Sequence, residues 1–159
     1  FDAVDFNFWG VTFADDSNRF YATLGTGGST YLLEGDVARR ELTVLRDNVE
    51  CPSLSPDGTR IAFKKRVDGG GLLEPVRWQI HLLDLATMEE TPVGDTRNVD
   101  DQVEWIDDDH LIYAVQDEGP PATLRPDLWV LPLGGTPQRV AYGASSPVAI
   151  GGPELTAAG

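Results

Sequence analysis

Short apolar runs alternate with polar residues along most of this chain, and turn-forming residues separate the runs. In IHLLDL (80–85) and LWVLPL (128–133) the apolar residues recur with a period of two, which is typical of strands. SLSPDGTRIAF (53–63) places Ser-Pro-Asp-Gly between two apolar runs, and this arrangement predicts a β-hairpin. Seventeen glycines and eleven prolines also favour short strands joined by many turns. The pattern predicts an all-β protein.

The hairpin pattern is an internal repeat. Three copies align, with a turn one residue shorter in the third: VTFADDSNRFYA (11–22), PSLSPDGTRIAF (52–63) and VEWIDDDHLIYA (103–114). The aligned residues before the turn are Phe13, Leu54 and Trp105. The aligned aspartates within the turn are Asp16, Asp57 and Asp108. Self-similarity of this kind is the signature of a repeat architecture.

Each copy is followed by a second half that contains an apolar strand, a polar turn and another short strand: 29–45, 78–94 and 127–143. Four antiparallel strands in roughly 40 to 50 residues match the size of one β-propeller blade. An amphipathic helix is an alternative over 36–50. The equivalent segments of the other copies carry Pro or Gly where a helix would not accept them, so we expect a strand.

We therefore predict one partial β-propeller domain over residues 1–159, with about three blades of four antiparallel strands. The expected blades are 8–48, 49–98 and 99–142. GASSPVAI (143–150) aligns with NVECPSL (48–54), at the start of the second copy, and this predicts a closing strand. GGPELTAAG (151–159) is expected to be a poorly ordered tail.

The net charge of the chain disfavours two classes of binding partner. Twenty-six acidic against twelve basic residues give a formal net charge of −14, which repels phosphate backbones and anionic lipid and so disfavours nucleic acid and membrane surfaces. No apolar stretch approaches the roughly 18 residues needed to cross a bilayer. The single cysteine, Cys51, excludes an internal disulfide and is expected to be a small buried residue. Because the chain does not begin with Met, we expect a processed or excised piece of a longer protein.

Catalytic chemistry has little support in the sequence. There is no G-x-S-x-G motif, and the two histidines, His81 and His110, lie in different copies of the repeat. His81 alternates with apolar neighbours, and His110 follows a hairpin turn, so both are expected to be structural. The acidic runs 100–101 and 107–109 offer oxygen ligands for calcium, but without the spacing of a known calcium loop. We expect solvated turns, no cofactor and no catalytic residue.

The Ser-Pro-Asp-Gly turn itself predicts a structural role for its residues. Pro56 presets φ for a type I turn, and Gly58 suits the left-handed position of a bulged hairpin. Asp57 is expected to accept hydrogen bonds from nearby backbone N–H groups.

CPSLSPDGTRIAF (51–63), followed by IHLLDLATMEETPV (80–93), resembles the WD-like β-propeller repeat of TolB-type proteins. In that pattern a proline and an apolar residue precede Ser-Pro-Asp-Gly, and an Asp-Leu strand follows before a turn. The first and third copies depart from it, because Asp15 and Asp107 replace the proline of the turn. The resemblance covers most of 8–150 and is greatest to the C-terminal half of actinobacterial TolB-like translocation proteins. It implies an extracytoplasmic or membrane-anchored location, through an N-terminal segment absent from this sequence.

The loops between the second and third strands of each blade lie on the face opposite the Asp-Gly hairpins. Two of them are long, and variable loops on a rigid scaffold are common recognition sites. The first contains Lys64, Lys65, Arg66 and Arg77, a third of the basic residues in the chain. The candidate binding residues of these loops are Arg66, Leu72, Leu73, Arg77, Trp78 and Arg125. The alternative for Trp78 is that it begins a strand and packs within the blade.

The predicted function is that of a non-enzymatic scaffold of TolB-like type that binds another protein or a cell-envelope component. One alternative is the gating propeller of a prolyl oligopeptidase-like serine hydrolase. Another is a propeller enzyme with a channel metal that acts on sugars or lactones. Propellers usually have four to eight blades, and three would leave a blade face and a β edge open. We therefore expect missing blades from the parent chain, or self-association through the open edges, to cover them.

Overall fold

The computed structural model describes residues 5–68, 76–116 and 125–150, and in these ranges the chain forms twelve strands and no helix. Blade 1 contains β1 (Asn7–Phe13), β2 (Arg19–Thr26), β3 (Ser29–Asp36) and β4 (Glu41–Asp47). Blade 2 contains β5 (Val49–Leu54), β6 (Arg60–Asp68), β7 (Arg77–Asp84) and β8 (Glu90–Pro92). Blade 3 contains β9 (Val103–Asp107), β10 (His110–Val115), β11 (Asp127–Pro132) and β12 (Gln138–Ala141). The segment that offered a helical alternative contains β4.

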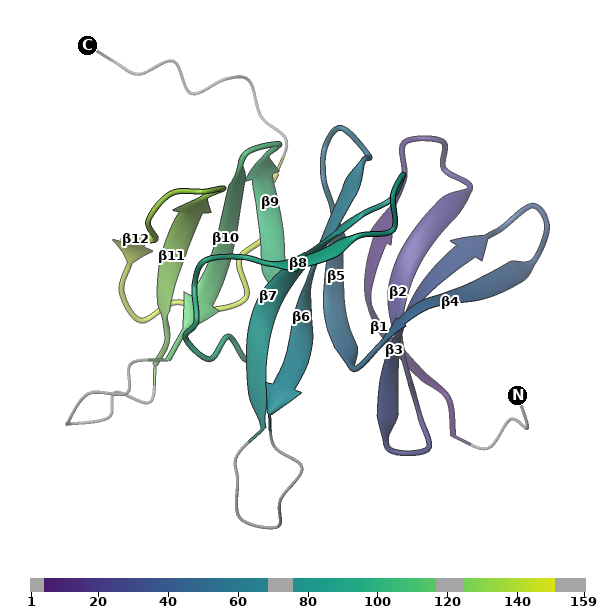
Figure 1. Ribbon diagram of the computed structural model, residues 1–159, viewed down its shortest axis with the longest axis horizontal. Coiled ribbons are helices and arrows are strands. Elements are labelled where there is room, and N and C mark those ends of the chain that lie inside the picture. The colour runs from purple at the N-terminus through teal and green to yellow at the C-terminus, as the bar shows by residue number, and fades with distance from the viewer. Residues whose placement is uncertain (1–4, 69–75, 117–124, 151–159) are drawn as a thin grey trace.

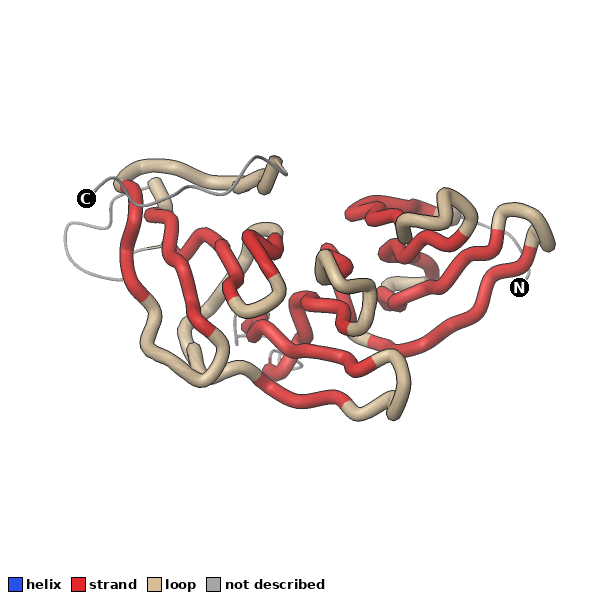
Figure 2. Tube along the Cα trace, turned by 90° about the horizontal axis from the view of Figure 1, so that it is seen from above, coloured by secondary structure: helices blue, strands red, loops and turns tan. Residues whose placement is uncertain are grey.

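Each blade is an antiparallel sheet in which strands adjacent in the sequence are hydrogen-bonded neighbours (Figure 1). The predicted all-β fold of about three four-stranded propeller blades is confirmed. Seen from above, the blades follow one another around an open arc that does not close into a ring (Figure 2). Because the described ranges contain no helix, they contain no helical segment that could cross a membrane.

The core consists of two apolar layers between the blades. Strand β6 shows how one strand serves both layers: Ile61 and Phe63 belong to the layer against blade 1, and Ala62 belongs to the layer against blade 3. All three side chains are fully buried. The period-two alternation read from the sequence therefore separates residues that face different neighbouring blades, and each layer is stabilised by the burial of apolar surface.

The first strands of blades 1 and 2 contain a bulge at equivalent places, between Trp9 and Thr12 and between Glu50 and Ser53. Gly10, at the first bulge, has φ of +59°, and a Cβ there would lie 2.9 Å from the Cα of Cys51. Glycine thus permits both the left-handed backbone and the close approach of β1 to β5.

Cys51 occupies the equivalent bulge of blade 2, with φ of +51°. Its backbone N–H donates a hydrogen bond to Oγ1 of Thr23 at 2.9 Å. The side chain is partly buried, and this burial raises the pKa of the Cys51 thiol. The thiol is therefore held in its protonated, weakly nucleophilic form.

Residues 143–150 do not form the closing strand that their sequence predicts. Ser146 has φ of +51°, the same as the aligned Cys51, so the segment begins like the first strand of a blade. In blades 1 to 3 the first strand is hydrogen-bonded to the second strand of its own blade. The segment has no such partner in the described ranges and is held instead by the Asp101 side chain, which accepts a hydrogen bond from the Ser146 N–H. The predicted tail (151–159) lies outside the described residues.

Each blade has one hairpin between its first and second strands and another between its third and fourth strands. A backbone hydrogen bond that recurs in all three blades joins these two hairpins, so they lie on one face. The residue after β3, β7 or β11 donates its N–H to a carbonyl in the preceding hairpin: Val37 to Asn18, Leu85 to Thr59 and Leu133 to Asp109, at 2.8–3.1 Å. We call this surface the hairpin face; it lies uppermost in Figure 1. The turn between β2 and β3 lies at the opposite end of blade 1.

Candidate functional site

The hairpin between β5 and β6 is stabilised by its own aspartate. Gly58 has φ of +70°, and its N–H donates to the Ser55 carbonyl at 2.8 Å. Asp57 Oδ1 accepts hydrogen bonds from Ser55 Oγ at 2.6 Å and from the N–H and Oγ1 of Thr59 at 2.9 and 2.8 Å. These hydrogen bonds, the one from Ser55 foremost, lower the pKa of Asp57. This carboxylate holds the turn, a role that requires no catalysis.

An aspartate has the same role in the other two blades. In blade 1, Asp16 Oδ1 accepts the N–H groups of Asn18 and Arg19 at 2.9 and 2.8 Å. The hydrogen bonds from the Arg19 and Asn18 backbones lower the pKa of Asp16 to about 2. In blade 3, Asp107 Oδ1 accepts the Asp109 N–H at 2.8 Å.

The sequence alignment of Asp108 with Asp57 is therefore wrong by one residue. The third turn is shortened by one residue before the aspartate that accepts the N–H groups of the turn. Asp107 therefore caps this turn, and the Asp108 side chain points toward another hairpin. The Asp108 Oδ1 accepts a hydrogen bond from the backbone N–H of Asp57 at 2.9 Å, which links the hairpins of blades 2 and 3.

Arg60, at the start of β6, completes the junction between blades 2 and 3. Its guanidinium lies 5.0 Å from the centre of the Trp105 ring, and its Nη2 donates to the Asp108 carbonyl at 2.6 Å. Trp105 in turn donates its Nε1–H to the Ser53 carbonyl at 3.0 Å. A cation, an aromatic ring and cross-blade hydrogen bonds thus occupy this junction on the hairpin face.

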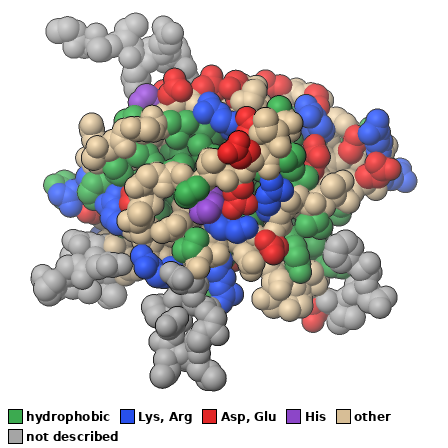
Figure 3. Space-filling model, in the orientation of Figure 1, with side chains coloured by type: hydrophobic (Ala, Val, Ile, Leu, Met, Phe, Trp, Pro, Cys, Tyr) green, Lys and Arg blue, Asp and Glu red, His purple; other side chains and the backbone are tan. Residues whose placement is uncertain are grey.

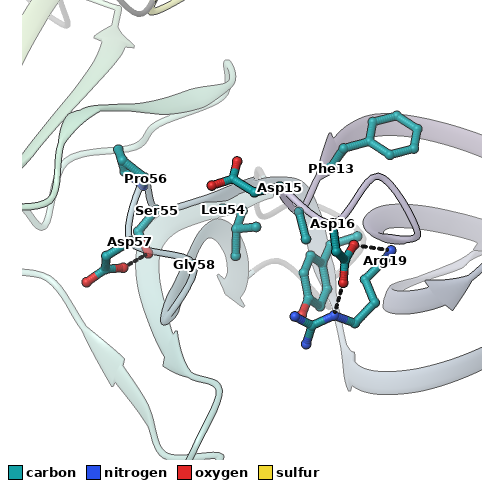
Figure 4. A pocket seen from close by; sticks show the side chains of 11 residues that line it. Phe13, Asp15, Asp16, Arg19, Leu54, Ser55, Pro56, Asp57 and Gly58 are labelled. Carbon is teal, nitrogen blue, oxygen red and sulfur yellow. Dashed lines mark hydrogen bonds and ion pairs between the residues drawn. The ribbon is translucent and has the colours of Figure 1, made fainter.

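The equivalent junction between blades 1 and 2 contains a pocket of ≈ 510 Å³. Here Leu54 stands at the position of Trp105, and Arg19 stands at the position of Arg60. The Nε of Arg19 pairs with Asp16 Oδ2 at 2.9 Å, within its own hairpin (Figure 4). Because Leu54 is smaller than Trp105 and Arg19 folds back onto Asp16, a space remains between the two hairpins. We call this space the inter-blade pocket.

The inter-blade pocket combines apolar and acidic side chains. Its large apolar side chains are Phe13, Tyr21 and Leu54, and its charged residues are Asp15, Asp16, Asp57 and Arg19. Three carboxylates against one guanidinium give the lining a formal charge of −2. The Asp15 carboxylate lies in the space between the hairpins, whereas the Phe13 ring, which is 61% exposed, and the Asp57 carboxylate point away from that space (Figure 4). Acidic side chains also gather along the upper edge of the molecule, where the hairpins end (Figure 3).

The loop residues singled out by the sequence have mixed placements on the opposite face. Arg66, Arg77 and Arg125 are exposed, whereas Leu72 and Leu73 lie outside the described residues. Trp78 is the second residue of β7 and is only 8% exposed, so it packs within the blade, as the alternative for this residue predicted, and is not available to a partner.

Within the blade, Trp78 contacts Lys64. The Lys64 Nζ lies 5.0 Å from the centre of the Trp78 ring and pairs with Glu50 at 3.4 Å. Lys64 is itself 4% exposed, so one of the basic residues assigned to the loop is a buried part of the blade.

The two histidines make short contacts with carboxylates. His81 Nδ1 lies 2.9 Å from Glu90 Oε1, and burial lowers the pKa of His81. His110 Nδ1 lies 2.8 Å from Asp107 Oδ1, on the hairpin face. Within the ranges that the structure describes, no three His, Cys, Asp or Glu side chains are grouped so that they could hold a metal ion.

The inter-blade pocket was not predicted from the sequence, which directed attention to the opposite face. A signal for it was nevertheless present. The aligned copies have Leu54 where the third copy has Trp105, and this difference in volume leaves one of two equivalent junctions open. Which way Arg19 turns could not be read from the alignment.

Comparisons with known proteins support the fold. No family model and no curated protein matches the sequence. TolB from Acinetobacter baumannii is similar in structure, with 17% identity and a TM-score of 0.69 over 89% of this chain and 34% of TolB. The β-propeller domain of the Trilobed protease from Pyrococcus furiosus matches with 15% identity and a TM-score of 0.63, over 86% of this chain and 43% of the other.

An oligogalacturonate lyase in complex with manganese is also similar, with 16% identity and a TM-score of 0.63 over 87% of this chain and 41% of the lyase. These proteins differ in what their names say they do, so the likeness concerns the fold. This chain spans about a third of the length of TolB. Its described residues form a partial β-propeller with the TolB-like fold.

Proposed function

We propose that this chain is part of a non-enzymatic β-propeller scaffold of TolB-like type. The scaffold is exported to the cell envelope and binds another protein there. The observation that carries the proposal is the inter-blade pocket. It is a recess of ≈ 510 Å³ between two hairpins that are each held by their own aspartate. A recess with apolar and charged walls on a rigid scaffold is suited to recognition.

The first and third blades also expose apolar surface that a further element of structure would cover. Large apolar side chains on blade 1 and around blade 3 are strongly exposed: Phe8 51%, Phe13 61%, Leu42 55%, Val140 55% and Tyr142 75%. The exposed large apolar residues of the middle blade, Val67, Val76 and Met88, reach only 36–39%. Further blades of the parent chain, or a second copy, would bury the apolar surface of the terminal blades.

Affinity capture from envelope extracts tests the scaffold function. The full-length protein is compared with a variant in which Leu54→Trp fills the inter-blade pocket, and with a second variant that has a shortened 66–77 loop. We expect a defined partner that the Leu54→Trp variant no longer captures. A protein that retains no partner would contradict the proposal. A G-x-S-x-G hydrolase domain in the parent reading frame would instead favour the gating propeller of a serine hydrolase.

A further inference from the structure

Trp9 differs from the other three tryptophans of the chain in what surrounds its ring. A cation lies over each of the others, 3.8–5.0 Å from the ring centre: Lys64 over Trp78, Arg60 over Trp105 and Arg97 over Trp129. Within the described ranges no cation lies over Trp9, and its indole N–H reaches solvent instead of a protein acceptor. Because Trp9 is also partly exposed, its ring and its N–H are available to a ligand.

A glycine of the neighbouring strand gives the Trp9 ring its place. Asn7 of β1, Gly25 of β2 and Thr30 of β3 lie directly opposite one another in the sheet, so they share one face. Trp9 follows Asn7 by two residues and lies on the same face. A Cβ on Gly25 would be 2.8 Å from the Cη2 and Cζ3 of Trp9, so the ring extends over Gly25. Asn7 and Thr30 therefore flank the ring.

A recess of ≈ 540 Å³ opens beside this ring, at the end of blade 1 opposite the hairpin face. We call it the Trp9 recess; its lining consists of Asp5, Asn7, Trp9 and residues 25–30. This lining contains one carboxylate, that of Asp5, and no basic residue. Its other polar side chains are an amide and three hydroxyls: Asn7, Thr26, Ser29 and Thr30.

These four polar side chains form no hydrogen bond with any residue that the structure describes, and their polar atoms are open to solvent. The hydroxyls of Thr12 and Thr23, on the same face of blade 1, instead accept backbone N–H groups of blade 2. The polar groups of the Trp9 recess are thus uncommitted, whereas those deeper between the blades stabilise the junction.

From this arrangement we propose that the Trp9 recess binds a neutral sugar residue of a glycan. A pyranose ring presents C–H groups on one face, and these pack against the indole face, which carries partial negative charge. The sugar hydroxyls exchange hydrogen bonds with the Asn7 amide and with the hydroxyls of the 25–30 turn. An anionic ligand would find no basic side chain in the lining, and the net charge of −14 would repel it.

The sugar site is independent of the proposed scaffold function, because it concerns another ligand at the opposite end of the blade from the inter-blade pocket. Titration calorimetry tests it with three uncharged probes: maltotriose, cellotriose and tri-N-acetylchitotriose. We expect saturable binding of at least one of them to the full-length protein. Its affinity should not change with salt concentration, since the ligand carries no charge.

Three variants locate the binding. Trp9→Ala removes the aromatic face and should abolish saturable binding. Asn7→Ala removes an exposed amide without touching the core, and should weaken binding about five-fold, as for the loss of one hydrogen bond. Gln138→Ala is the matched control, because it removes an exposed amide from a strand of blade 3. Asn7→Ala keeps the test valid if Trp9→Ala does not fold.

Tetramethylammonium chloride is the competing probe, because a small cation also binds an aromatic face and could pair with Asp5. Absence of binding by all three sugars, saturable binding of tetramethylammonium in their place, or equal effects of Asn7→Ala and Gln138→Ala would each overturn the sugar site. The Leu54→Trp variant should bind the sugar normally. Loss of partner capture with retained sugar binding would therefore separate the two sites, and failure of capture alone would leave the sugar site standing.

Discussion

The guanidinium of Arg60 lies 5.0 Å from the centre of the Trp105 ring, across the junction between blades 2 and 3. The equivalent residues of the preceding junction, Arg19 and Leu54, leave a pocket instead. A single repeat has thus produced one junction that holds its own cation and one that is open. Two differences account for this: the side-chain volume at the position of Leu54 and Trp105, and the direction in which the arginine turns.

Replacement of Trp105 should loosen the closed junction. Trp105 is 4% exposed and donates to the Ser53 carbonyl, so Trp105→Leu removes buried apolar volume and this hydrogen bond. We expect a loss of about 3 kcal/mol in the free energy of unfolding, measured by urea denaturation of the full-length protein. A double-mutant cycle with Arg60→Ala should give a coupling of about 0.5–1 kcal/mol. Additive effects would show that the cation and the ring do not interact.

Replacement of Gly58 should destabilise blade 2. Gly58 has φ of +70°, a conformation that a β-branched residue adopts only under strain, although a Cβ there would meet no neighbour within 4 Å. Gly58→Val should therefore cost about 1 kcal/mol or more through the backbone alone. Gly94→Val is the matched control, because Gly94 also has open space around it and is not among the glycines with positive φ. Equal denaturation midpoints for the two variants would contradict the turn geometry.

Much of the fold was predictable because a repeat samples the same structure three times. The Pro and Gly residues in two copies excluded the helix that the first copy alone would have allowed over β4. Residues 143–150 show the limit of this reasoning. Their sequence and the φ of Ser146 match the start of a blade, yet a strand also requires a hydrogen-bonded neighbour, which no local pattern specifies.

The candidate site was less predictable, since it depends on which way side chains turn. Trp78 and Lys64 looked like exposed loop residues, but they cover one another in the blade. Aspartates 107 and 108 are adjacent in the sequence, and hydrogen bonds rather than alignment decide which of them caps the turn. The sequence could place these residues at the ends of strands, but it could not assign their partners.

Acidification should weaken the protein through His81. Burial lowers the pKa of His81 in the folded state below its ordinary value near 6.5, so the unfolded chain binds the proton more readily. Stability is therefore retained above about pH 6.5 and is lost as the pH falls below it. The free energy of unfolding should decrease between pH 7.5 and 5.5, and His81→Gln should reduce this decrease. His110→Gln, at the exposed pair with Asp107, is the control; if it had the same effect as His81→Gln, His81 would not be the responsible group.

The 159-residue chain expressed alone should associate with itself. The exposed apolar residues of the terminal blades, among them Phe8 in β1 and Val140 in β12, offer surface that water solvates poorly. Light scattering should give a mass above the 17.3 kDa of one chain, rising with concentration. The double variant Phe8→Ser/Val140→Ser should shift the protein toward the monomer, whereas Met88→Ser, on the middle blade, should not. A concentration-independent monomer would show that the terminal blades need no cover, and the requirement for further blades or a second copy would then be withdrawn.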